Sequence, residues 1–146
     1  MMKRDLGVRL LLIGLFTALI HSAVIGADGG ERLAGSYYRG DHLGYNVTLN
    51  LVADGTYSST WTGCLGVYGT ASGHWKIRGD DLVLTPATEA GLMKGHLTVL
   101  KIRRSNGHFE LLPVEDEPRL KSEEERKMLS FAQVPADQSR GLPSSS

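Results

Sequence analysis

Residues 45–62 alternate apolar and polar side chains in a rhythm of two. The apolar positions of the first half are Tyr45, Val47, Leu49 and Leu51, and the polar positions between them are Asn46, Thr48 and Asn50. Because successive side chains of a strand point to opposite faces, this order places the apolar groups on one face. Asp54-Gly55 follows, a dipeptide that tolerates the positive φ of tight hairpin turns. The pattern therefore predicts a β-hairpin over residues 45–62.

The same rhythm recurs further along the chain, with turn residues such as Gly79-Asp80 and Asn106-Gly107 between the extended segments. The further extended segments are 37–38, 75–78, 82–84, 97–103 and 109–111. This spacing predicts an all-β fold, an antiparallel meander of about six to eight strands that forms a small closed or partly open barrel. Residues 63–73 and 86–95 are rich in glycine or alanine, and we interpret them as loops at the barrel rim.

The composition changes to charged residues after Glu115. Asp116-Glu117-Pro118 is typical of a helix start, because proline suits the first turn and acids suit its positive end. We therefore predict one C-terminal helix over residues 116–133, following a β-barrel domain over residues 28–115. Residues 134–146 contain prolines and three terminal serines, and we predict that they are a disordered tail.

The chain begins with a basic segment, an uncharged apolar run and an exit of small residues. This order is typical of a secretory signal, so we predict a signal peptide over residues 1–27 and an exported protein, secreted or periplasmic. An uncleaved segment would be the only contact with a membrane. The formal net charge of the chain is zero, which gives no reason to expect nucleic-acid binding.

Several short motifs resemble those of the lipocalin-like barrels of the calycin group. They are Gly35-Ser36-Tyr37, the run from Leu49 to Tyr57, Gly73-His74-Trp75 and Leu82-Val83-Leu84. The resemblance covers about residues 33–113. It implies an up-and-down barrel, and the Gly-x-Trp mark of that family's first strand is here replaced by Gly35-Ser36-Tyr37.

The candidate chemistry is sparse. Four histidines (His42, His74, His96 and His108) follow the signal segment, and none stands in the spacing of a known metal motif. We interpret them as surface or rim residues, with convergence on a metal as the alternative. Cys64 cannot form a disulfide within the chain, and we interpret it as a buried small side chain, with a free thiol as the alternative. We predict no cofactor and no catalytic residue.

The side chains most suited to a ligand are aromatic or soft. These candidate ligand-binding residues are Tyr45, Tyr57, Trp61, Tyr68, Trp75 and Met93. Core packing is the alternative interpretation of the same residues. The leading hypothesis is a non-enzymatic exported module that binds a small or apolar ligand or a surface component at one open barrel end. The alternatives are a protein-interaction module, such as an inhibitor of an extracellular enzyme, and a small metal-binding protein or enzyme using the histidines.

Overall fold

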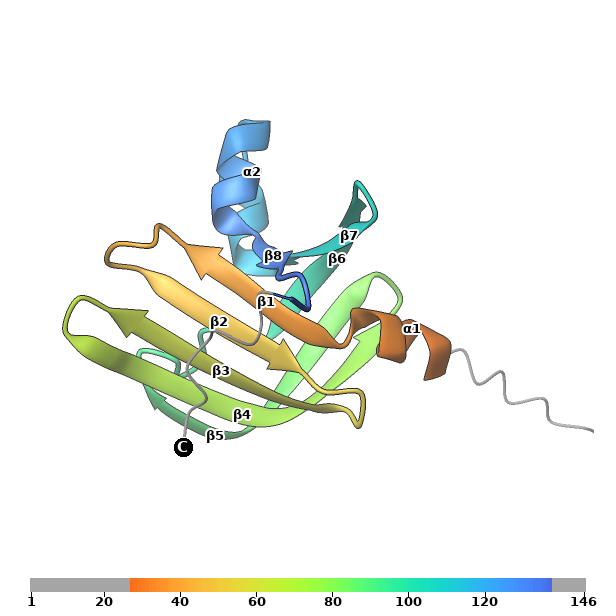
Figure 1. Ribbon diagram of the computed structural model, residues 1–146, viewed down its shortest axis with the longest axis horizontal. Coiled ribbons are helices and arrows are strands. Elements are labelled where there is room, and N and C mark those ends of the chain that lie inside the picture. The colour runs from red at the N-terminus through yellow and green to blue at the C-terminus, as the bar shows by residue number, and fades with distance from the viewer. Residues whose placement is uncertain (1–26, 138–146) are drawn as a thin grey trace, which may run out of the picture.

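Eight antiparallel strands close into a barrel in the computed structural model, which describes residues 27–137 (Figure 1). The strands are β1 (Gly35–Gly40), β2 (Asn46–Leu51), β3 (Thr56–Gly63), β4 (Gly66–Arg78), β5 (Asp81–Gly91), β6 (Val99–Ser105), β7 (His108–Pro113) and β8 (Phe131–Gln133). Each strand pairs with the next along the chain, and β8 pairs back with β1. The predicted antiparallel meander is therefore confirmed, and the barrel is closed.

The two ends of the chain lie mostly outside the described residues. The predicted signal peptide falls on residues 1–26 apart from its last residue, and Ala27 begins a short helix, α1 (Ala27–Leu33). Residues 138–146 of the predicted tail are also outside. At the start of that tail, the amide of Val134 donates to the carbonyl oxygen of Ser36 at 2.8 Å. Within residues 27–137, no helix has both the length and the apolar run that crossing a bilayer requires.

The predicted hairpin is formed by β2 and β3. Every odd-numbered residue of β2 is buried and every even-numbered residue is partly exposed. Leu49 lies opposite Ser59, and Leu51 lies opposite Tyr57, in the register of the pair. At the turn, the Asp54 carboxylate accepts hydrogen bonds from the amide of Thr56 at 2.8 Å and from its hydroxyl at 2.6 Å. The two-residue rhythm thus identifies the inward face correctly.

The two segments interpreted as rim loops, 63–73 and 86–95, are mostly strand, and that interpretation was wrong. β4 occupies the first segment from Gly66 onward, and β5 continues to Gly91. The cause is close packing between the two backbones. A side chain on Gly73 would overlap the carbonyl oxygen of Thr85, and the register shifts beside it. The glycines and alanines here belong to a β-bulge and to a close contact between two strands. Such a segment has a composition similar to that of a loop.

The segment expected to be helical over 116–133 is divided into three elements. They are a 3-10 helix, η1 (Val114–Arg119), an α-helix, α2 (Glu123–Leu129), and β8. Pro118 lacks the amide hydrogen that an α-helix interior needs, so the chain starts again at Ser122, which forms a capping box with Glu125. Phe131 follows the helix as the first residue of β8 and is fully buried. One C-terminal helix is confirmed, and the residues after it close the barrel.

The barrel has two ends with different coverings (Figure 1). α1 and the turns between β2 and β3, β4 and β5, and β6 and β7 lie at one end, which we call the helix end. Three further connections, β1–β2, β3–β4 and β5–β6, lie at the opposite end, which we call the loop end. The core between them holds the largest fully buried side chains: Tyr37, Phe131, Leu33, Leu49, Leu82, Met93, Leu97, Leu100, Leu111, Leu112, Val47 and Pro113.

Candidate functional site

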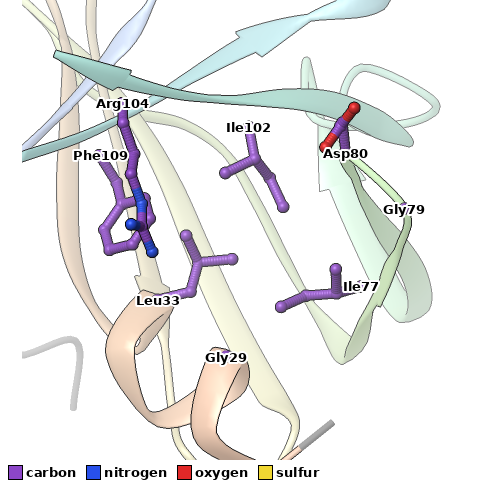
Figure 2. A pocket seen from close by; sticks show the side chains of 8 residues that line it. All are labelled: Gly29, Leu33, Ile77, Gly79, Asp80, Ile102, Arg104 and Phe109. Atoms are coloured by element: carbon purple, nitrogen blue, oxygen red, sulfur yellow. The ribbon is translucent and has the colours of Figure 1, made fainter. Parts of the chain in front are cut away.

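A cleft of about 340 Å³ opens at the helix end of the barrel (Figure 2). We call it the mouth. Its lining residues are Gly29, Leu33, Ile77, Gly79, Asp80, Ile102, Arg104 and Phe109. Most of its wall is apolar, because it continues the inward-facing rows of three strands. Ile77 is two residues beyond buried Trp75 on β4, and Ile102 is two residues beyond buried Leu100 on β6.

The mouth exists because β5 and β6 separate after a short contact. They pair only from Asp81 to Val83 on the β5 side. Two further backbone hydrogen bonds of 2.8 Å flank this contact, one from the amide of Ile102 to the carbonyl oxygen of Asp80 and one from the amide of Leu84 to that of Thr98. β6 then continues to Ser105, paired with β7. The β4–β5 turn and the β6–β7 hairpin therefore diverge, and the inward side chains between them remain accessible.

α1 forms the floor of the mouth. Leu33 is buried with 1% exposure, and its carbonyl oxygen accepts a hydrogen bond of 2.7 Å from the Tyr37 hydroxyl. Burial raises the pKa of that hydroxyl above its ordinary range. A methyl group on Gly29 would lie 3.8 Å from Cδ1 of Ile77, an ordinary contact distance. Any longer side chain at position 29 would therefore project toward the mouth.

The mouth has one positive and one negative group on its rim. The guanidinium carbon of Arg104 lies 5.0 Å from the centre of the Phe109 ring, a cation–π geometry. Asp80 lies on the other side of the opening (Figure 2). Arg104 forms no ion pair with another residue in the range 27–137. An anionic ligand group would thus meet this cation without displacing a partner of the described chain.

The interior at the loop end is filled by an ion pair. Nη1 of Arg39 lies 2.9 Å from Oδ2 of Asp116, and both side chains are only 8% exposed. The Arg39 guanidinium also lies over the rings of Tyr45, at 5.6 Å, and Phe131, at 5.9 Å. These contacts place a paired cation between two aromatic rings inside the barrel at the loop end.

The connection between β5 and β6, residues 92–98, covers the loop end. Met93 and Leu97 of this connection are buried in the core. The His96 ring lies against Trp61, with ring centroids 4.9 Å apart. Burial, followed by the charge of Arg39, holds the pKa of His96 below its ordinary value. The connection is therefore held by apolar side chains and by the ring contact of His96 with Trp61.

None of the six residues predicted to bind a ligand lines the mouth. Tyr57, Trp75 and Met93 are buried in the core cluster, and Tyr45 and Trp61 pack against it. Tyr45 and Trp61 meet edge to face at the loop end, with centroids 4.9 Å apart. Their surroundings are those of core residues, and their role as ligand contacts stays a prediction.

Two further aromatic candidates, Trp75 and Tyr68, lie apart from that pair. Trp75 is near the helix end, where its ring approaches Gly30 of α1 and its Nε1 donates to the carbonyl oxygen of Val52 at 2.9 Å. Tyr68 lies at the β3–β4 hairpin, where its ring packs on Gly63. The structure thus distributes the six residues over both ends of the barrel.

The histidines and the cysteine are also dispersed. His42, which stacks on Tyr38, is exposed, as are His74 and His108. Cys64 is exposed as well, so its interpretation as a buried side chain was wrong; its Sγ donates to the carbonyl oxygen of Leu43 at 3.4 Å. Among residues 27–137, no group of three or more His, Cys, Asp or Glu side chains is placed to hold a metal ion.

Sequence reasoning missed the residues that line the mouth. Ile77 has the same parity as Trp75, and Phe109 has the same parity as Leu111, so following the alternation to the strand ends would have found both. The sequence contains no comparable signal for Leu33, which reaches the mouth from α1. Comparison of the chain with protein-family models, with curated proteins and with solved structures found no match.

Proposed function

We propose that the protein is an exported, non-enzymatic binding module that holds a small, mainly apolar ligand in the mouth. The observation that carries this proposal is the exposure of inward-facing apolar side chains at the helix end. Ile77 is 36% exposed, although its neighbour Trp75 in the same inward row is buried. A volume of about 340 Å³ lies at the lower end of the range for small-molecule sites.

The lining specifies the chemistry of the ligand. Leu33, Ile77, Ile102 and Phe109 offer hydrocarbon and aromatic contacts, whose burial stabilises a complex by about 25 cal/mol per Å². Arg104 adds one cation at the rim. We therefore propose that the ligand is a small molecule with an apolar body and a carboxylate head that pairs with Arg104. The protein would bind this ligand and release it chemically unchanged.

The proposal extends the resemblance to lipocalin-like barrels. The closed eight-stranded meander supports a place for this chain among the calycin-type proteins. The ligand position that we propose is the mouth, because the loop-end interior is occupied by the Arg39–Asp116 pair. Export depends on the signal peptide predicted over residues 1–27.

Dye binding to the purified full-length chain tests the proposal. We expect the apolar anion 1-anilinonaphthalene-8-sulfonate to bind and decanoate to displace it. Ile77→Glu places a charge in the apolar wall of the mouth. The affinity of this variant for the dye and for decanoate should fall about tenfold or more, equivalent to a loss of about 1.4 kcal/mol of binding free energy. Val67→Glu is the matched control, because Val67 is 64% exposed on the same strand and does not line the mouth.

A second substitution tests the head group. Arg104→Gln should remove the preference for decanoate over the uncharged decanol while keeping the apolar contact. If Ile77→Glu and Val67→Glu bind the dye equally well, the mouth is not the binding site and the proposal is wrong.

The loop end supports a second candidate function, interaction with a protein such as an extracellular enzyme. Leu43, Leu65 and Leu92 stand on three neighbouring connections and are 80%, 91% and 56% exposed. The Asp41 carboxylate accepts three backbone amides, each at 2.9 Å, which fixes the loop that presents Leu43 and lowers the pKa of Asp41. Leu65→Asp would remove inhibition of such an enzyme without affecting dye binding in the mouth.

A further inference from the structure

Charged residues are nearly absent from one long part of the barrel. Between His42 and Trp75, Asp54 is the single member of the Asp, Glu, Lys and Arg types. At the average charged content of the chain, 22%, these 34 positions would hold about seven such residues. The strand positions of this stretch that face away from the core are therefore uncharged, and most of them hold Thr, Ser or Asn.

The strand register gathers these groups on the outer face of β2 to β5. Thr48, Thr60 and Thr70 lie opposite one another in one row across the sheet. A second row joins Asn50, Ser58, Ser72 and Thr88. We call these seven residues the hydroxyl face. It lies on the opposite side of the sheet from buried residues such as Leu49, and Figure 1 shows these strands side by side.

Much of the hydrogen-bonding capacity of the hydroxyl face is unused within the described chain. The side chains of Asn50, Ser58, Thr60 and Thr70 form no hydrogen bond with another described residue, whereas Ser72 and Thr88 bond each other at 2.7 Å. Neighbouring strands lie about 4.8 Å apart, so the rows repeat donors and acceptors at that interval. Each hydroxyl both donates and accepts, and an asparagine amide does the same.

The charged groups of the barrel are collected elsewhere. Lys101 and Arg103 of β6 pair with Asp81 and Glu117, and Arg126 of α2 pairs with Glu110 of β7. The seven residues of the hydroxyl face are thus uncharged, and charged side chains resume on the same strands nearer the helix end, at Lys76 and Arg78 of β4 and Asp81 of β5. A surface segregated in this way distinguishes partners by charge.

We propose that the hydroxyl face docks an uncharged polysaccharide. Nucleic acids and anionic lipids would require Lys or Arg on the face, and protein interfaces are built around aromatic or apolar anchors. A neutral polyol exchanges hydrogen bonds with hydroxyl and amide groups without removing any charge from water. Tyr38 lies opposite Thr48 at the end of one row, where its partly exposed ring stacks on the ring of His42, so the row ends in an uncharged aromatic side chain.

Co-sedimentation of the full-length protein with cellulose, chitin and insoluble starch tests this proposal. We expect retention on at least one of them that persists in 1 M NaCl, because salt screens only charged contacts. Thr60→Lys should weaken retention about tenfold. Ser105→Lys, a similar change on β6, should leave it unchanged. The double variant Thr60→Val/Thr70→Val removes two hydroxyls, keeps β-branched side chains and should also weaken retention.

Three outcomes would overturn the proposal. They are no retention on any of the three polysaccharides, equal retention on anionic alginate that disappears in 1 M NaCl, and equal retention of Thr60→Lys and Ser105→Lys. The mouth variant Ile77→Glu should sediment like the unmodified chain. Failure of the hydroxyl face is therefore distinguishable from failure of the ligand site.

Discussion

Replacing Asp116 by asparagine removes the anionic partner of a buried cation. Arg39 and Asp116 are each 8% exposed in their side chains, and 2.9 Å separates Nη1 from Oδ2. An unpaired charge left at such a site costs about 3–5 kcal/mol. Since the free energy of unfolding of a domain is only about 5–15 kcal/mol, Asp116→Asn should remove a large fraction of the stability.

Urea denaturation followed by tryptophan fluorescence measures this loss. With a urea dependence of about 2 kcal/mol per molar, a loss of 4 kcal/mol moves the midpoint down by about 2 M at an unchanged slope. Glu117→Gln is the control, because the Arg103–Glu117 pair is longer, at 3.4 Å, and its side chains are 40% and 43% exposed. Breaking such an exposed pair should cost at most about 1 kcal/mol.

A double substitution separates the ion pair from the packing around it. Arg39→Met/Asp116→Leu replaces both charges with apolar groups and should recover most of the stability, because buried ion pairs are often no better than well-packed apolar residues. If Asp116→Asn loses no more stability than Glu117→Gln, the charge of Arg39 is not confined in the barrel and the reasoning is refuted.

Two further predictions concern the loop end. The pKa of His96 in the folded protein lies below its ordinary 6.5, so the unfolded chain binds more protons at mildly acidic pH. The contribution of neutral His96 to the free energy of unfolding is therefore present above about pH 6.5 and is lost as the pH falls toward the pKa of the folded protein. His96→Gln should flatten this part of the curve of urea midpoint against pH. An unchanged curve would contradict the prediction. Gly91→Ala should lower the free energy of unfolding by about 2 kcal/mol or more, and by more than Gly107→Ala does. Both glycines have a positive φ, but only at Gly91 would a side chain overlap the carbonyl oxygen of Tyr68. Equal losses in thermal denaturation would contradict that close contact.

The fold was predictable wherever burial alternates along a strand. Leu49 and Leu51 are inward because a strand has a period of two, and the sequence alone contains that information. The extent of β4 and β5 was not predictable from Gly73 and its neighbours, because a glycine in a strand contact and a glycine in a loop look alike without the partner strand. Tertiary contact decides between them.

The C-terminal part shows the same limit. Ser122 and Glu125 form a capping box that the sequence does display, so the helix start could have been placed correctly. Phe131 fits a helical stripe as well as a strand, and its position in β8 depends on the gap that β1 and β7 leave. Alternation marks Ile77 and Phe109 as inward-facing, but their exposure in the mouth depends on the separation of β5 from β6, which is a property of pairing between distant residues.

The placement of β8 has a consequence for biosynthesis. Only two residue pairs join it to β1 and two join it to β7, yet these pairs cover the edges of the first and seventh strands. A chain emerging from the ribosome exposes both edges until residue 133 has appeared. Unpaired edges recruit other chains, so newly made protein is most prone to aggregate in the interval before its last strand is released.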